Sequence, residues 1–181
     1  MTSKINRTFF FDQVNLRLFD GKLPGNARAT LEQVLDYWEQ NSPKADDRWL
    51  AYAMGTAHHE RDRTFGPIRE YGRGKGKKYP PYYGRGLVQL TWDYNYKKMS
   101  PKVGVDLYKN PDLALEVRYA IPIMFIGMKE GIFTGKKFAD YFSPTKEDWV
   151  SARRIINVLD KANTIAGHAK KYYGAISYTT G

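Results

Sequence analysis

Hydrophobic side chains recur at helical spacing over two stretches in the first third of the chain. In residues 28–41 the apolar positions are Leu31, Val34, Leu35 and Trp38, and the pattern ends at the polar residues Asn41 and Ser42. A second series begins near Asp47 and continues through Leu50, Ala53, Met54 and Ala57. Positions three and four residues apart share one face of an α-helix. The pattern therefore predicts two amphipathic helices, of which the second runs out at the sequence "AHHE".

Later stretches show the same period. Residues 110–131, "NPDLALEVRYAIPIMFIGMKEG", are predicted to form one long apolar helix closed by Gly131. We expect a kink or break at Pro122, because a proline removes a helix hydrogen bond and clashes with the preceding turn. Residues 147–158 and 163–175 are also predicted to be helical.

Residues 62–86 have no steady period and are rich in Gly, Pro, Arg, Lys and Tyr. This composition predicts a long loop or a short irregular hairpin, and a loop of this length in a compact domain is usually functional. A short helix is expected to begin near Thr91. Since strand signals are few, the predicted fold is mainly α, with at most one small β-hairpin in the loop.

Length and composition indicate one folded domain over residues 1–181, in which the first forty or so residues supply supporting helices. The apolar fraction of 42% and the aromatic fraction of 15% argue against disorder. No apolar run approaches the roughly 18 residues that a membrane span needs. The apolar patch near the start is too short for a secretory signal. We therefore expect a chain that is made as a soluble, cytoplasmic protein.

The chain carries a net charge of +10 and contains no cysteine. The positive charge favours binding to polyanions, among which nucleic acid, anionic lipid, lipopolysaccharide and acidic cell-wall polymer all qualify. The absence of cysteine excludes disulfides and thiolate metal sites.

The sequence "AHHERD" raises three interpretations for Glu60: a catalytic acid, a metal ligand, or a solvated helix end. His58 and His59 point about 100° apart on a helix, so both cannot face one ion, and the zinc-protease pattern H-E-x-x-H is missing. We therefore predict no metal site and no cofactor.

Helical geometry places Glu60 at the edge of the apolar face of its helix. Partial desolvation and the negative end of the helix dipole both raise the pKa of such a carboxyl group, as a general acid requires. From the helix alone, however, an ion pair between Glu60 and a neighbouring arginine is the more common arrangement.

A second carboxylate follows ten residues later, at Glu70 in "PIREYGRGKGKK". The basic residues around it favour its charged form. A carboxyl group held neutral and another held charged are the pair that a glycoside hydrolase uses. The alternative is a solvated charged loop. The segment "RGKGKK" itself, residues 73–78, is either a solvated loop or a contact for an acidic substrate beside a cleft.

The block "YYGRGLVQLTWDYNY", residues 82–96, matches neither the dinucleotide fingerprint nor the phosphate-binding loop. It offers aromatic faces that stack on sugar rings, and amides and hydroxyls that bond sugar substituents. Gln89, Thr91, Asp93 and Asn95 alternate with apolar residues and can form one polar row. The alternative is that many of these aromatic residues belong to the core.

Taken in order, "AHHE", "YYGRGLVQLTWDYNY", "NPDLAL" and "RRIIN" resemble the motifs of glycoside hydrolase family 19, whose plant members are chitinases. These four motifs together span residues 57–157. The resemblance implies a lysozyme-like α fold with a substrate cleft and an inverting mechanism. It assigns Glu60 as the general acid, Glu70 as the general base, and Thr91 as the hydroxyl that helps to hold the attacking water. The two carboxyl groups should then lie roughly 6.5 to 9.5 Å apart.

The resemblance also implies the residues that bind sugar. They are Gln89, Tyr94, Asn95 and Asn157, to which we add Tyr83 from the same block and Arg154 beside Asn157. Plant members have a longer, disulfide-bearing stretch between the two glutamates, so Asp62 stays as a rival for the base.

The compact, cysteine-free form resembles the bacteriophage members of the family, which act as endolysins. This implies a muramidase that cleaves the β-1,4 bonds of peptidoglycan, acts as a monomer, and stays in the host cytoplasm until another protein opens the inner membrane. Its charge would attract the acidic wall and lipopolysaccharide. The alternatives are a chitinase, and a non-enzymatic protein that binds cell wall or nucleic acid, although no nucleic-acid-binding signature is present.

Overall fold

The computed structural model describes residues 4–59 and 65–179, and this part of the chain is mainly helical, as the sequence predicts. Its α-helices are α1 (Arg7–Leu18), α2 (Gly25–Asn41), α3 (Asp47–His59), α4 (Asp93–Val103), α5 (Val117–Glu130) and α6 (Ala162–Ala175). Short 3-10 helices are η1 (Tyr71–Gly74), η2 (Pro111–Leu115), η3 (Phe138–Asp140) and η4 (Ser151–Ile155). Two antiparallel hairpins pair β1 (Ile68–Arg69) with β2 (Arg85–Gly86), and β3 (Phe142–Ser143) with β4 (Lys146–Glu147).

The centre of the fold is the packing of α3 against α6. The two helices lie close together at Gly55, where an added Cβ atom would lie 2.7 Å from the backbone nitrogen of Ala169. Only glycine permits this separation, because any side chain would meet the backbone of the other helix. Helix α1 packs on α6 and buries Phe10 and Phe11.

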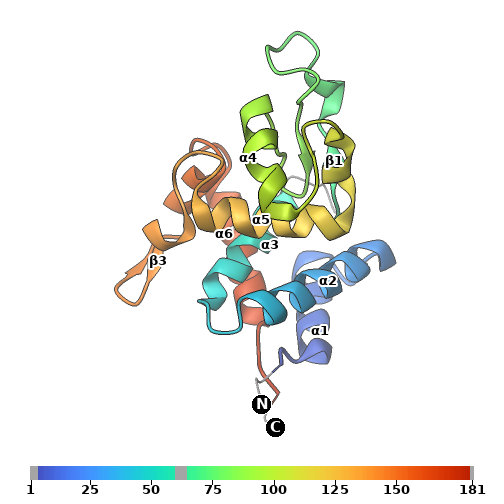
Figure 1. Cartoon of the computed structure of the whole chain (residues 1–181). Helices are drawn as coiled ribbons and strands as arrows, with labels where there is room; N and C mark the ends of the chain where they lie inside the picture. Colours follow the sequence, from blue (N-terminus) through green and yellow to red (C-terminus); the bar gives the residue numbers. More distant parts are fainter. Residues whose placement is uncertain (1–3, 60–64, 180–181) are drawn as a thin grey trace.

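Helix α5 joins two hydrophobic clusters. Its residues Ile121 and Met124 belong to the large cluster around α3, while Ile123 belongs to a smaller one that contains Leu90 and Tyr96. In Figure 1, α5 lies across the middle of the molecule, with α1 and α2 on one side and α4 and the β1–β2 hairpin on the other. The candidate site lies near the junction of these two parts.

Both helices predicted from the first third of the sequence are confirmed. Helix α2 ends at Asn41 as expected and begins at Gly25, a few residues before the predicted start. Helix α3 begins at Asp47. The helix expected near Thr91 is α4, which begins two residues later, at Asp93.

Of the kink or break expected at Pro122, the break is wrong: α5 continues through this residue, and the predicted helix is instead interrupted at Glu116. An interior proline costs about 3 kcal/mol, but the flanking residues of α5 are buried on both sides and offset that cost. Glu116 separates α5 from η2, and η2 is bonded to the β1–β2 hairpin. The carboxylate of Asp112 accepts 2.8 Å hydrogen bonds from Arg69 and Arg85.

The structure also corrects the predicted helix over residues 147–158. Only the short η4 forms there, and the hairpin β3–β4, which the sequence did not indicate, precedes it. The apolar positions that suggested a helix are instead side chains that reach the core from η4 and the residues before it, namely Trp149, Ala152 and Ile155. The other late prediction is confirmed, since α6 closely matches residues 163–175. Among the described residues, no helix has both the length and the apolar character needed to cross a membrane.

Candidate active site

Glu70 extends the β1–β2 hairpin by one residue and is held by hydrogen bonds at three points. Its backbone N–H donates to the carbonyl of Gly84 at 2.7 Å. The N–H of Gly84 donates back to Oε2 of the carboxylate at 2.9 Å, and the hydroxyl of Tyr79 donates to Oε1 at 2.6 Å. The hydrogen bond to this carboxylate raises the pKa of Tyr79 to about 12. Each carboxylate oxygen keeps a lone pair free for a further donor.

These partners of Glu70 differ from the cations that the sequence indicated. In the described part of the chain, Glu70 forms no ion pair. Arg69 turns to the other face because neighbouring side chains on a strand alternate, and it pairs with Asp112 at 2.8 Å. The donors that surround the carboxylate are a neutral hydroxyl and a backbone amide.

The chain after β2 folds into a tight turn that presents its polar side chains to one side. Gly86 has a φ of 91°, and a Cβ atom there would lie 2.9 Å from the carbonyl oxygen of Ala114. Gln89 and Trp92 also have positive φ values, of 57° and 75°. Such backbone angles are costly for residues other than glycine, and they cluster at functional sites. The hydroxyl of Thr91 donates to the carbonyl of Gln89 at 2.8 Å, so its oxygen remains available as an acceptor.

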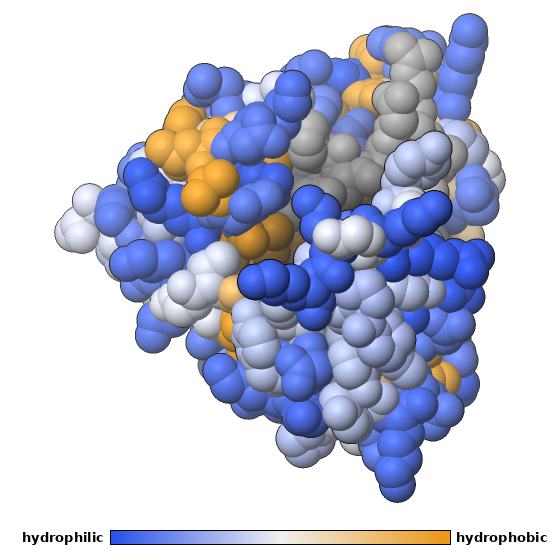
Figure 2. Space-filling model, turned by 90° about the horizontal axis from the view of Figure 1, so that it is seen from above, coloured by the Kyte–Doolittle hydropathy of each residue, from blue (hydrophilic) through white to orange (hydrophobic). Residues whose placement is uncertain are grey.

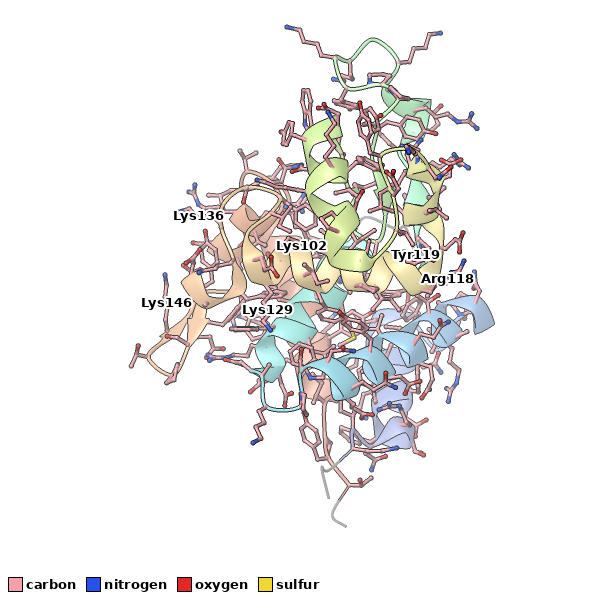
Figure 3. The ribbon with its side chains drawn as sticks, in the orientation of Figure 1. Lys102, Arg118, Tyr119, Lys129, Lys136 and Lys146 are labelled. Carbon is pink, nitrogen blue, oxygen red and sulfur yellow. The ribbon has the colours of Figure 1, made fainter. Side chains whose placement is uncertain are left out.

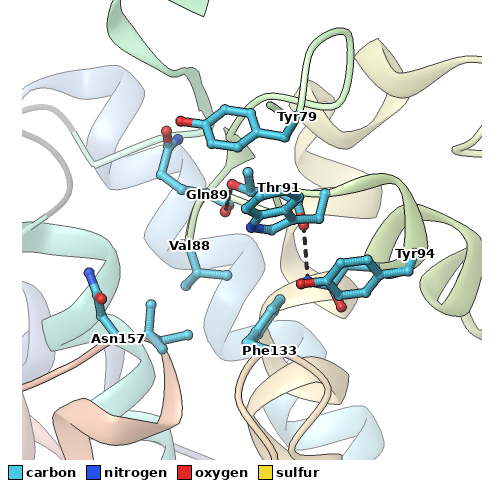
Figure 4. Close-up of a pocket in the computed structure, with 10 residues that line it drawn as sticks. Tyr79, Val88, Gln89, Thr91, Tyr94, Phe133 and Asn157 are labelled. Carbon is cyan, nitrogen blue, oxygen red and sulfur yellow. Dashed lines mark hydrogen bonds between the residues drawn. The ribbon is translucent and has the colours of Figure 1, made fainter. Parts of the chain in front are cut away.

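A pocket of about 410 Å³ opens beside this turn. Tyr79 and Gln89 lie on one side of it, and Phe133 and Asn157 lie on the other (Figure 4). Its lining combines aromatic rings with amides and a hydroxyl, and the residues are Tyr79, Val88, Gln89, Thr91, Trp92, Tyr94, Asn95, Phe133, Ile156 and Asn157.

Asn95 provides the most specific polar feature of this pocket. The side chain is 4% exposed, and its Nδ2 donates to the carbonyl of Thr91 at 2.9 Å. Its Oδ1 is buried, and no donor in the described part of the chain reaches it. A buried acceptor without a partner is costly unless a ligand supplies a donor. An N–H or O–H group of a sugar would satisfy it.

The structure brings together five of the residues predicted from the sequence. All five line the pocket, and they are Gln89, Thr91, Tyr94, Asn95 and Asn157. Glu70 is not among the lining residues, but it accepts a hydrogen bond from Tyr79, which is. The predicted acid Glu60 and the rival base Asp62 lie outside the described residues.

Two predicted sugar-binding residues lie away from this pocket. Tyr83 is buried, with the guanidinium of Arg85 stacked 3.6 Å from the centre of its ring. Its hydroxyl accepts a 3.1 Å hydrogen bond from Arg69. Arg154 is exposed and does not line the pocket, while its neighbour Arg153 is buried and donates to the carbonyl of Asp160.

Five residues of the wall were not predicted from the sequence as site residues, and they are Tyr79, Val88, Trp92, Phe133 and Ile156. Of these, Tyr79 and Phe133 also lie outside the four motifs. Tyr79 stands in a segment of lysines and prolines that carries no periodic signal. The ring of Phe133 packs directly against Gly127 of α5, where a Cβ atom would lie 2.2 Å from the ring. The only sequence signal for this contact is a glycine inside an otherwise apolar helix.

The histidine next to the end of α3 belongs to the core. Nδ1 of His58 lies 3.0 Å from the hydroxyl of Tyr172, and its ring packs against Phe19 and His168. Among residues 4–59 and 65–179, no cluster of three or more metal-ligating side chains is present.

Comparison with known families places this site in context. The family model described as chitinase class I, of glycoside hydrolase family 19, matches residues 28–125, more than half of the chain. Basic endochitinase B of Arabidopsis thaliana is 59% identical over 98 residues, which cover 49% of this chain and 28% of that protein. Inactive chitinase-like protein 1 of Hevea brasiliensis is 49% identical over 98 residues, which cover 49% of this chain and 30% of that protein. The chain therefore spans less than a third of the length of these two relatives.

A solved structure shares the architecture. A mutant of chitinase C superposes with a TM-score of 0.53 at 15% identity, over 98% of this chain and 94% of that one. At this identity the likeness establishes the lysozyme-like family 19 fold that the resemblance implied.

Proposed function

Because this chain belongs to glycoside hydrolase family 19, the chitinase class I family, we propose that it hydrolyses β-1,4 bonds in glycans of N-acetylated aminosugars, with chitin as the simplest substrate. The observation that carries this proposal is the pocket next to Glu70, whose lining combines aromatic rings and amides with Asn95, a residue whose buried Oδ1 has no donor in the described part of the chain. An acetamido N–H or a sugar hydroxyl supplies the donor that this oxygen lacks.

The proposed mechanism is a single displacement by water. Glu70 accepts a proton from the attacking water while Glu60 donates a proton to the leaving oxygen. The role of Glu60 rests on the motif match, since it lies outside the described residues. Thr91 already donates its own proton to Gln89, so its oxygen can accept the second hydrogen of the water. The water is then oriented by two acceptors, with its lone pair free to attack the sugar.

The test is hydrolysis of soluble chitin oligomers. The wild-type chain should release products whose new reducing ends first have the α configuration, as NMR can show. Glu60→Gln and Glu70→Gln should each lower kcat by about a thousandfold, which is typical of the loss of a general acid or base. Glu130→Gln, an exposed change at the end of α5, serves as the control and should keep full activity. Undiminished activity of Glu70→Gln would remove Glu70 from the role of base.

Peptidoglycan cleavage, with the endolysin role, is the second candidate function. The observation that favours it is the positive charge of the chain, +10 overall, because peptidoglycan carries carboxylates whereas chitin is neutral. Mass spectrometry of digested peptidoglycan would identify the new reducing end. Muramic acid at that end supports a muramidase, and the absence of any released fragment, together with chitin cleavage, supports a chitinase.

A further inference from the structure

The loop between β1 and β2 carries a dense group of exposed cations. We call residues 73–78 the cationic loop, and its charged side chains are Arg73, Lys75, Lys77 and Lys78. The loop projects from the top of the molecule in Figure 1, and hydrophilic side chains cover most of the face seen from that end in Figure 2. Long side chains that end in nitrogen point outward from it in Figure 3.

These cations differ from charged residues elsewhere on the surface. Lys102 and Arg118, labelled in Figure 3, form ion pairs with Glu130 and Glu116 respectively. Within the described part of the chain, none of the cations of the cationic loop forms an ion pair. The charge of the loop is therefore available to an external anion.

The cationic loop is attached directly to the wall of the pocket. Gly74 lies against the ring of Tyr79, since a Cβ atom there would be 2.7 Å from the ring edge. Tyr79 lines the pocket and bonds Glu70. Arg73 and Lys75 flank this contact in the sequence. A glycan bound in the pocket would therefore pass beside these charges.

Arg73 has a backbone conformation that glycine would adopt at lower cost. Its φ is 49°, a left-handed value that also occurs at its neighbours Gly72 and Gly74. A residue with a Cβ atom pays roughly 1 kcal/mol for this conformation, whereas glycine does not. The turn is held by backbone bonds that start at Glu70, whose carbonyl accepts from the N–H of Arg73 at 3.1 Å.

We infer that the cationic loop is a binding subsite for carboxylates carried by an aminosugar glycan whose sugar backbone occupies the pocket, so that it selects anionic strands over neutral ones. The inference rests on the proposed function for the position of the glycan. Unpaired cations within about one Debye length of each other act together on a passing polyanion. A neutral chitin strand gains nothing from them.

The test compares two substrates and two variants. The loop variant carries Arg73→Gln, Lys75→Gln, Lys77→Gln and Lys78→Gln. The control variant removes the same charge from exposed positions that do not line the pocket, with Lys22→Gln, Lys44→Gln, Lys170→Gln and Lys171→Gln. Binding is measured by co-sedimentation with purified peptidoglycan sacculi at low and high salt. Hydrolysis of neutral chitin oligomers is measured in parallel.

The loop variant should bind sacculi roughly tenfold more weakly at low salt. The difference in sacculus binding between the loop variant and the wild type should vanish near 1 M salt, where the Debye length is about 3 Å. Chitin oligomer hydrolysis should stay within about twofold of the wild type, and the control variant should bind sacculi as the wild type does. Amidation of the sacculus carboxylates should abolish the advantage of the wild type.

Three results would overturn the inference. One is an equal loss of binding in both variants, which would assign the effect to net charge. Another is that the wild type still binds amidated sacculi more tightly than the loop variant does, which would mean that the anion is not a carboxylate. The third is a loop variant that binds sacculi like the wild type. Because co-sedimentation needs no catalysis, a wild-type chain that binds sacculi but cleaves no glycan would refute the proposed function alone.

Discussion

The hydroxyl of Tyr79 donates a 2.6 Å hydrogen bond to Oε1 of Glu70, so the residue that directly follows the cationic loop contacts the candidate base. The ring of Tyr79 also meets the indole of Trp92 edge-on, with 5.1 Å between ring centroids. One aromatic residue thus orients the carboxylate and forms part of the pocket wall. Since the pKa of Tyr79 is raised to about 12, it remains a donor at any pH where a glycosidase works.

Tyr79→Phe removes this donor and keeps the ring. We expect kcat on chitin oligomers to fall about tenfold, because a hydrogen bond to a charged group contributes about 1.5 kcal/mol. Tyr71→Phe, a fully exposed position between β1 and β2, should keep the wild-type kcat. An unchanged kcat in Tyr79→Phe would mean that the contact has no influence on the base.

Asn95→Ala removes the unpartnered acceptor of the pocket. A site built to bond a polar group of a ligand loses affinity when that bond is removed. We therefore expect KM for chitin oligomers to rise by about tenfold, while kcat changes less. Steady-state kinetics check this split. An unchanged KM would show that the sugar does not bond Oδ1 of Asn95.

Gly55→Ala tests the contact between α3 and α6. Alanine normally stabilises a helix interior by about 1 kcal/mol relative to glycine. Here the new Cβ atom would lie 2.7 Å from the backbone of Ala169, so the helices must separate and the free energy of unfolding should fall by about 1 to 3 kcal/mol.

The matched control for that change is Gly167→Ala in α6, where a Cβ atom meets nothing within 4 Å. It should raise the free energy of unfolding by about 0.5 to 1 kcal/mol. Thermal and denaturant unfolding measure both variants. A rise in stability for Gly55→Ala would contradict the close packing of the two helices.

Asp112→Asn tests the ion pairs that join η2 to the β1–β2 hairpin. Hydrogen bonds from Arg69 and Arg85 lower the pKa of Asp112, in that order of importance. Its stabilising effect is therefore fully present above the ordinary aspartate value of about 3.9 and is lost as the pH falls through the lower value of the folded state. We expect the variant to unfold about 1 kcal/mol more easily at pH 7, since Asp112 is half-exposed and the pairs are screened.

The difference between Asp112→Asn and the wild type should narrow as the pH falls below about 4. Glu116→Gln, which breaks the exposed pair with Arg118, should change stability by less than about 0.5 kcal/mol. Unfolding curves from pH 2 to 7 measure both. A difference for Asp112→Asn that stays constant across this range would exclude the ion pairs as its cause.

The sequence by itself determined the elements that depend on local spacing. The apolar positions of α2 and α3 repeat every three or four residues, and a helix with such a face needs only some apolar surface to cover it. The motif residues Gln89, Thr91 and Asn95 lie so close together in the chain that one turn can bring them to one pocket. The family resemblance then added Asn157, which no local pattern connects to them.

Tertiary structure decided where local signals conflict or are silent. Proline in α5 predicts a break, but the buried residues on both sides of Pro122 keep the helix intact. The interruption lies at Glu116 instead, beside η2, which Asp112 bonds to the β1–β2 hairpin. Tyr79 and Phe133 reach the pocket through contacts with distant segments, which leave no periodic trace in the sequence. Local spacing fixes which face of a helix is apolar, whereas the energy of long-range contacts decides which helices continue and which side chains meet.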